Sequence, residues 1–333
     1  MKINRMKYIY KGEENEKAPI ETTDVQFLSS VQIIHREAFR RCEHLTSIII
    51  PNTIHTIGIS AFGQCKSLKN VHFGNPHNLQ TIENDVFEGC ESLTNINIPP
   101  FVKAIGGGCF HGCTSLSNII LPIFLQLVRE FTFCECKSLV SINIPPCVQV
   151  IGEYAFEGCE SLVAVSMPAS VHTIETEVFC NCTSLKFITI SPLLTTIEES
   201  TFYDCKSLTN IILPPNIHTI EQDAFCGCES LTTIDIPFSV KHIGIDAFDE
   251  CDSLKTVYLS RKCVLDENAF TQSTKLIYGW YEVGQYILFR ELFLKGRSSL
   301  NPVFGNDTNL QTIQIFISQT YEDIFRQTLC FLI

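Results

Sequence analysis

Cysteines are the residues of this 333-residue chain with the greatest chemical potential, and there are seventeen of them. Thiols in such numbers could pair as disulfides, bind a metal or act as nucleophiles. Ten recur at a spacing of 23 residues, interrupted once by a spacing of 25. These ten are Cys42, Cys65, Cys90, Cys113, Cys136, Cys159, Cys182, Cys205, Cys228 and Cys251.

The surroundings of the recurrent cysteines favour a structural role over a chemical one. Each has a phenylalanine three residues before it and a leucine three residues after it, as Phe156 and Leu162 flank Cys159. A small free thiol is among the most buried residue types, so we expect these cysteines to fill core positions. Stacked turns would bring neighbouring thiols within disulfide range, but pairing of ten equivalent thiols is not expected.

Three further cysteines form C-x-C pairs with recurrent ones, in alternate repeats. Zinc sites use C-x-x-C spacing from two places, with both thiols free to converge. If one thiol of each C-x-C pair is core, no four-ligand site forms, and we predict neither a metal nor a cofactor. The pairs are Cys134 with Cys136, Cys180 with Cys182, and Cys226 with Cys228.

No other motif predicts catalysis. His55, His172 and His218 share one outer position but do not occur in consecutive repeats. The run Gly106-Gly107-Gly108 lacks the following helix and lysine of a phosphate-binding loop. Metalloprotease, nucleophile-elbow and kinase signatures are also absent, so the sequence predicts a protein that is not an enzyme.

The elements that position these residues are themselves repeated. Ile142 and Ile144 alternate as in a short strand with one buried face, and Pro145 closes that strand. A second pair of apolar residues, Val148 and Ile151, completes the repeat. A period of this length, with apolar residues at fixed offsets, indicates a solenoid whose turns share one core.

The repeat, written as I-G-x-x-A-F-x-x-C-x-S-L-x-x-I-x-I-P-x-x-V-x-x-I, resembles the BspA-like type of leucine-rich repeat. The resemblance covers residues 25–276. It implies a right-handed β-rich solenoid with a short parallel strand per turn, used for adhesion or other macromolecular binding, often at a cell surface. We therefore expect a leucine-rich repeat solenoid of about 10 to 12 turns with atypical terminal caps.

The chain divides into three parts by the regularity of the repeat. Residues 1–20 are charged and unpatterned, which predicts a leader or a cap. Residues 21–276 contain the repeats. Residues 277–333 diverge and then return to one late copy of the repeat, which predicts a C-terminal repeat and cap.

Charge and hydropathy limit the partners. The net charge is −12 without a cluster of lysine and arginine, so we expect no nucleic acid and net repulsion from an anionic membrane. There is no run of 18 apolar residues and no apolar core of a secretory signal, which predicts no membrane span and a cytoplasmic location. The family resemblance offers the cell surface as an alternative.

The predicted binding residues point outward from the strands. Exposed asparagines, aromatic and aliphatic residues there can mark a contact patch for a protein partner. Alternatively, such residues simply suit strands, and stacked asparagines stabilise the sheet through their side chains. The candidates are Asn70, Asn95, Asn97, Asn118, Asn143, Phe187, Ile212, Asp235 and Tyr258.

Two non-catalytic functions remain open from the sequence, beside an enzymatic or thiol-redox role that would require a reactive cysteine. One is a non-catalytic module that binds another protein through the face of the parallel sheet. The other is a structural or adhesion protein that assembles with copies of itself. The repeat pattern predicts a surface long enough for either.

Overall fold

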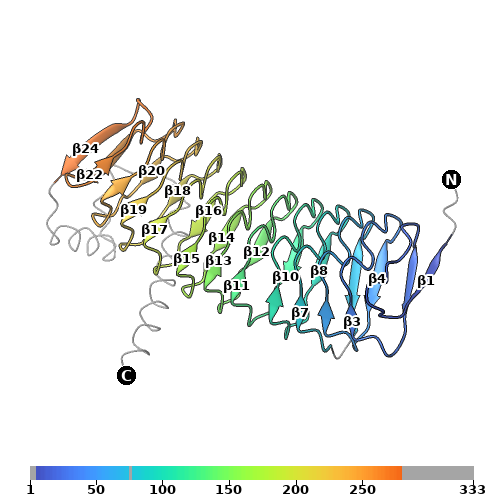
Figure 1. The fold of residues 1–333 in the computed structure, drawn as a ribbon. Helices are drawn as coiled ribbons and strands as arrows, with labels where there is room; N and C mark the ends of the chain where they lie inside the picture. The colour runs from blue at the N-terminus through green and yellow to red at the C-terminus, as the bar shows by residue number, and fades with distance from the viewer. Residues whose placement is uncertain (1–4, 75–76, 280–333) are drawn as a thin grey trace, which may run out of the picture. The chain divides into compact units, whose positions relative to one another are not determined.

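The repeats form a solenoid of parallel strands (Figure 1). The computed structural model describes residues 5–74 and 77–279. Within this part, each regular repeat contributes one strand of two to five residues, then one strand of two residues, then a strandless segment. These three segments give each turn three sides, which we call sheet A, sheet B and the turn side.

Sheet A contains the longer strands, which pair in parallel in short ladders. Its alternating burial pattern places every second side chain in the core, as the sequence predicts. The strands are β1 (Lys7–Tyr10), β2 (Asp24–Phe27), β4 (Ser47–Ile50), β6 (Asn70–Phe73), β8 (Asn95–Asn97), β10 (Asn118–Ile120), β12 (Ser141–Asn143), β14 (Ala164–Ser166), β16 (Phe187–Thr189), β18 (Asn210–Ile211), β20 (Thr233–Ile234), β22 (Thr256–Ser260) and β24 (Lys275–Gly279).

Sheet B contains the two-residue strands, also in parallel register. The second residue of nearly every strand is buried and the first points outward. The strands are β3 (Ile33–Ile34), β5 (Thr56–Ile57), β7 (Thr81–Ile82), β9 (Ala104–Ile105), β11 (Leu127–Val128), β13 (Val150–Ile151), β15 (Thr173–Ile174), β17 (Thr196–Ile197), β19 (Thr219–Ile220), β21 (His242–Ile243) and β23 (Val264–Leu265).

A continuous stack of phenylalanine rings runs through the core. From Phe39 to Phe270, consecutive rings lie 4.8 to 5.8 Å apart between centroids and stay within 19° of parallel. The rings from Phe39 to Phe248 are fully buried. Stacked aromatic pairs add about 0.5–1.5 kcal/mol each beyond the burial of their area. The repeated phenylalanine predicted from the sequence therefore joins each turn to the next.

The recurrent cysteines occupy buried positions beside this stack, as predicted. The thiol of Cys159 donates a hydrogen bond of 3.2 Å to the carbonyl oxygen of Phe133, one turn earlier. That oxygen also accepts the backbone N–H of Cys136 at 3.1 Å. The same thiol contact recurs from Cys65 to Cys251 at 3.0 to 3.3 Å. Each cysteine therefore links two turns without covalent chemistry.

The turn side requires left-handed backbone at two positions per repeat, which the sequence analysis did not identify. In one repeat these positions are Tyr154, with φ of 56°, and Gly158, with φ of 66°. Glycine adopts this conformation freely, whereas an aromatic residue with positive φ is unusual. The stacked turns impose the conformation on whichever residue occupies the position.

The N-terminal residues from 5 onward pack against the first repeat, and we call this segment the cap. Tyr10 is fully buried, and its ring packs against Phe27 and Phe39 at the end of the ring stack. The Tyr10 hydroxyl accepts a hydrogen bond of 2.9 Å from the backbone N–H of His35. Strand β1 adds to β2, so the first repeat is covered by a segment that lacks the repeat pattern.

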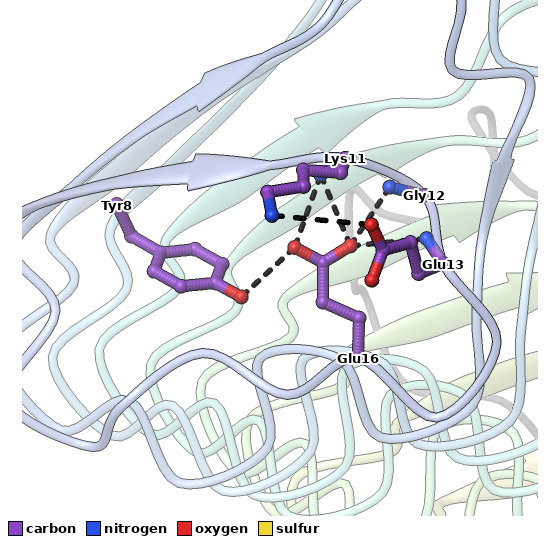
Figure 2. Close-up of polar contacts among 5 residues, drawn as sticks. All are labelled: Tyr8, Lys11, Gly12, Glu13 and Glu16. Carbon is purple, nitrogen blue, oxygen red and sulfur yellow. Dashed lines mark hydrogen bonds and ion pairs between the residues drawn. The ribbon is translucent and has the colours of Figure 1, made fainter.

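The loop after β1 is organised by the carboxylate of Glu16 (Figure 2). Its oxygens accept the backbone N–H groups of Lys11, Gly12 and Glu13 at 2.8 to 3.1 Å. They also accept the hydroxyl of Tyr8 at 2.9 Å. Partial burial alone raises the pKa of Glu16, but these hydrogen bonds outweigh burial and lower it.

At the other end the repeat continues beyond the last recurrent cysteine. The ring of Phe270 stacks on Phe248 at 4.8 Å, and Cys263 packs partly buried against the core. Strands β22 and β24 pair there. Of the predicted C-terminal repeat and cap, residues 277–333, residues 277–279 belong to β24 and residues 280–333 lie outside the described residues.

Substitution of Phe156 by alanine removes one ring from the middle of the stack. We expect the free energy of unfolding to fall by about 3–5 kcal/mol, because a buried cavity replaces the ring. Thermal or denaturant unfolding measures the change. The exposed Phe187 provides the matched control, and its alanine variant should lose less than about 1 kcal/mol. Equal midpoints for the two variants would contradict the assignment of the core face.

Substitution of Glu16 by glutamine tests the carboxylate in the cap. We expect a local loss of about 1 kcal/mol, seen as faster amide hydrogen exchange at Lys11, Gly12 and Glu13. Because the folded-state pKa of Glu16 is lowered, its contribution is present above its unfolded pKa and is lost as pH falls through the folded pKa. The exchange difference between wild type and variant should therefore disappear in acid. A difference independent of pH would show that the charge is not responsible.

Candidate binding surface

The outward residues of sheet A form two columns that run along the solenoid. Column one holds the first outward residue of each repeat, and column two holds the residue two positions later. Column one is Ser47, Asn70, Asn95, Asn118, Ser141, Ala164, Phe187, Asn210, Thr233 and Thr256. Column two is Ile49, His72, Asn97, Ile120, Asn143, Ser166, Thr189, Ile212, Asp235 and Tyr258.

All nine predicted binding residues are exposed on these columns. Asn95 pairs directly with Asn118 in the ladder between β8 and β10. Asn70 lies on the neighbouring strand β6. Strand β6 contacts β8, but the two strands do not form a hydrogen-bonded ladder. Of the three asparagines predicted to stack, only Asn95 and Asn118 are therefore paired across neighbouring strands.

The predicted aromatic and aliphatic residues lie on different columns. Phe187, in column one, pairs with Ala164 and is 55% exposed. Ile212, in column two, forms a bridge with Thr189 and is 52% exposed. The two residues are diagonal neighbours, and Tyr258 lies two repeats beyond Ile212 in the same column.

Two valines enlarge the apolar area around Phe187, and the sequence analysis missed them. Val140 and Val163 precede β12 and β14 and are 50% and 36% exposed. The backbone N–H of Val163 donates to the carbonyl of Val140, which places them in adjacent turns. We name Val140, Val163, Ala164, Phe187 and Ile212 the central apolar patch. The sequence signal that could have identified the two valines is their position directly before the strand, where other repeats have lysine, threonine or serine.

Charge is almost absent from the two columns. Asp235 is their one carboxylate, His72 is their one histidine, and neither column contains lysine or arginine. The whole chain nevertheless has a net charge of −12. The two columns of sheet A therefore carry almost no charge, although the protein as a whole is acidic.

The acidic residues of the repeats gather instead on the turn side. Glu198 and Glu221 directly follow Ile197 and Ile220, which pair across β17 and β19. Burial raises the pKa of Glu198, and the neighbouring carboxylate of Glu221 raises it further. Lysines offset part of this charge between consecutive turns, as in the ion pairs Lys66–Glu91, Lys137–Glu160 and Lys206–Glu229, at 2.8 to 2.9 Å.

The other sequence candidates do not come together as a site. The ten recurrent cysteines are buried in separate turns, and burial raises the pKa of thiols such as Cys159. Of the C-x-C partners, Cys134 and Cys180 are also buried. Across residues 5–74 and 77–279, no three His, Cys, Asp or Glu side chains are arranged to hold a metal ion. The same residues contain no helix that could cross a membrane.

Comparison with solved structures identifies similar folds in bacteria. The pneumococcal vaccine antigen PcpA is 21% identical with a TM-score of 0.57, over 85% of this chain and 74% of that chain. A leucine-rich repeat protein from Eubacterium ventriosum is 19% identical with a TM-score of 0.50, over 83% and 92%. A leucine rich cell surface protein from Faecalibacterium prausnitzii is 26% identical over 76% and 89%, but with a TM-score of only 0.37. At these values the first two alignments establish the fold alone.

Comparison with families gives a more direct result. No curated protein matches the chain. The BspA type leucine-rich repeat region, in six copies, matches residues 32–163 and 149–277, which together exceed half of the chain. The repeated phenylalanine, cysteine and leucine anchors lie within these matches. The chain therefore belongs to the family of BspA type leucine-rich repeat proteins.

Proposed function

We propose that this protein is a non-catalytic binding module that recognises a protein partner through sheet A. The observation that carries the proposal is the near absence of charge from columns one and two, on a chain with net charge −12. Buried centres of protein interfaces are depleted of charged residues and enriched in aromatic ones. The two columns of sheet A share the depletion of charge, and the turn side does not.

The central apolar patch supplies the anchor of the proposed interface. Phe187 and Ile212 are both more than half exposed, although each could bury its side chain against a partner. A few large apolar residues near the middle of an interface commonly supply most of its binding energy. The asparagines of β8, β10 and β12 would lie beside the patch, toward the N-terminal end of the solenoid, and offer hydrogen-bonding groups to the partner.

The dimensions of sheet A also suit a protein-sized partner. Eleven turns at the ~4.8 Å spacing of adjacent strands give a surface about 50 Å long. Such a length exceeds the needs of a small molecule. The same surface could pair two copies of the chain, and this second possibility predicts a mass that rises with protein concentration.

Arginines introduced on sheet A should abolish partner binding. The variant carries Asn97→Arg, Asn143→Arg and Asp235→Arg, all at exposed positions of column two. Unpaired charges in the centre of an interface cost several kcal/mol, so we expect at least about a hundredfold loss of affinity. Affinity capture from native extract, followed by titration with the captured protein, measures the effect.

A control with the same added charge separates recognition from general electrostatics. It carries Gln126→Arg, Gln222→Arg and Glu199→Arg, which are exposed on sheet B and the turn side. Capture should be unchanged by the control variant. Equal losses in both variants, or equal recovery in both, would place the partner elsewhere. Concentration-dependent mass without any captured partner would favour self-assembly.

Thiol labelling tests the proposal that the cysteines have no catalytic role. Burial raises the pKa of Cys42 and of Cys251 to about 12, so their thiolates are scarce near neutral pH. Among the described cysteines, only Cys147 is exposed. We expect native labelling at Cys147, its loss in Cys147→Ser, and labelling of the recurrent cysteines only after denaturation. Rapid native labelling of a recurrent cysteine, located by peptide mass spectrometry, would instead support a redox or nucleophilic function.

A further inference from the structure

A second apolar surface lies at the corner where sheet A meets sheet B. The loops that join β8 to β9, β10 to β11 and β12 to β13 are stacked tight turns (Figure 1). Each is closed by a hydrogen bond of 3.0 to 3.1 Å, as between the N–H of Leu125 and the carbonyl of Pro122. The two central residues of each turn are exposed. We name these six the corner ridge: Pro100, Phe101, Ile123, Phe124, Pro146 and Cys147.

Three large apolar side chains of the ridge are more than half exposed. Phe101 is 70% exposed, Phe124 is 59% and Ile123 is 53%, and Ile120 and Leu127 extend the exposed apolar area on either side. The fold does not require apolar residues here, because the turns at Ser170, Asn216 and Ser239 hold polar ones at the position of Phe101. The exposed rings therefore need an explanation other than packing.

The shape of the ridge favours a deformable partner. The two central residues of a tight turn lie at its tip, and their side chains project outward. A row of such turns is therefore a convex ridge. A rigid protein would need a matching groove to cover it. The headgroup layer of a lipid bilayer can instead part around projecting apolar side chains, and it accommodates amphipathic surfaces in this way.

Charges near the ridge favour an anionic lipid surface. Phe101 and Lys103 line one shallow hollow with His55, and no carboxylate lines that hollow. The outward residues of sheet B, from Ile33 to Val264, also contain no carboxylate. Most acidic residues of the repeats lie on the turn side, which is the side opposite this corner, and Asp235 of sheet A lies several turns away from the ridge. With a Debye length of ~8 Å at physiological ionic strength, their repulsion of a membrane at the ridge is screened.

We propose that the corner ridge attaches the protein peripherally to a phospholipid bilayer with anionic headgroups. The side chains of Phe101, Ile123 and Phe124 would lie at the boundary between headgroups and acyl chains. The ammonium group of Lys103 would meet a headgroup phosphate at the hollow beside Phe101. The net charge alone predicts repulsion from such a membrane. Because the acidic residues are concentrated on other parts of the solenoid, we expect attraction at this corner instead. The proposal does not depend on the function of sheet A.

Sedimentation of the full chain with vesicles tests the proposal. The vesicles are phosphatidylcholine with and without phosphatidylserine. We expect binding to vesicles that contain phosphatidylserine, and about tenfold weaker binding for the double variant Phe101→Ser, Phe124→Ser. Phe101→Trp with Phe124→Trp should retain binding, because large aromatic residues remain at the ridge. Lys103→Glu should weaken binding only to the anionic vesicles.

The matched control removes a pair of large apolar residues from sheet A, both also more than half exposed. Phe187→Ser with Ile212→Ser should bind vesicles as wild type does, while it loses any protein partner of sheet A. No sedimentation of the wild type, or equal losses in the ridge and sheet A variants, would overturn the proposal. If the ridge variant lost a captured protein but not the vesicles, the ridge would be a protein-binding surface and the lipid proposal would be wrong. The unfolding midpoints of all variants should match, since these side chains are exposed.

Discussion

The solenoid repeats one interaction at the same buried carbonyl group in every turn. The phenylalanine carbonyl has two lone pairs, and a second hydrogen bond to it contributes about 0.5–1.5 kcal/mol. One partner is the backbone N–H of the cysteine three residues later, and the other is the thiol of the following turn. Alanine lacks the sulfur atom, so it would leave that space empty and supply no donor. Cysteine is small, apolar enough for the core and still able to donate, which explains its recurrence without any redox or metal chemistry.

Parallel register has a further consequence, because it places equivalent residues of successive turns side by side. In the core this repetition is favourable, since ring stacks on ring and aliphatic residue on aliphatic residue. On the surface it brings like charges together, as in Glu198 and Glu221. The lysines beside Glu91, Glu160 and Glu229 show one remedy, although each exposed pair contributes little alone. Sheet A avoids the problem because its columns carry almost no charge.

Repetition also decides how much could be predicted from the sequence. Ten copies of one pattern fixed the strands, the buried phenylalanines and cysteines and the outward columns, because each copy confirmed the others. The cap built by Tyr10 and Glu16 occurs once and has no period, so its burial and hydrogen bonds could not be inferred. Left-handed positions such as Tyr154 were missed because several residue types occupy them. The ring of Phe101 looked like any apolar residue, although polar Ser170, Asn216 and Ser239 at the equivalent position of other turns were a signal of exposure.

Column two of sheet A and the corner ridge adjoin at an apolar residue, Ile120, and this limits how the two surfaces can be used together. Ile120 ends the outward column of β10 and lies three residues before Ile123 of the corner ridge. A partner that covers Asn97, Ile120 and Asn143 would reach the edge of the ridge. A partner centred on Phe187 and Ile212 would leave the ridge free for a membrane. The nine predicted residues therefore divide into two groups, and only the group around Phe187 is compatible with simultaneous attachment at both surfaces.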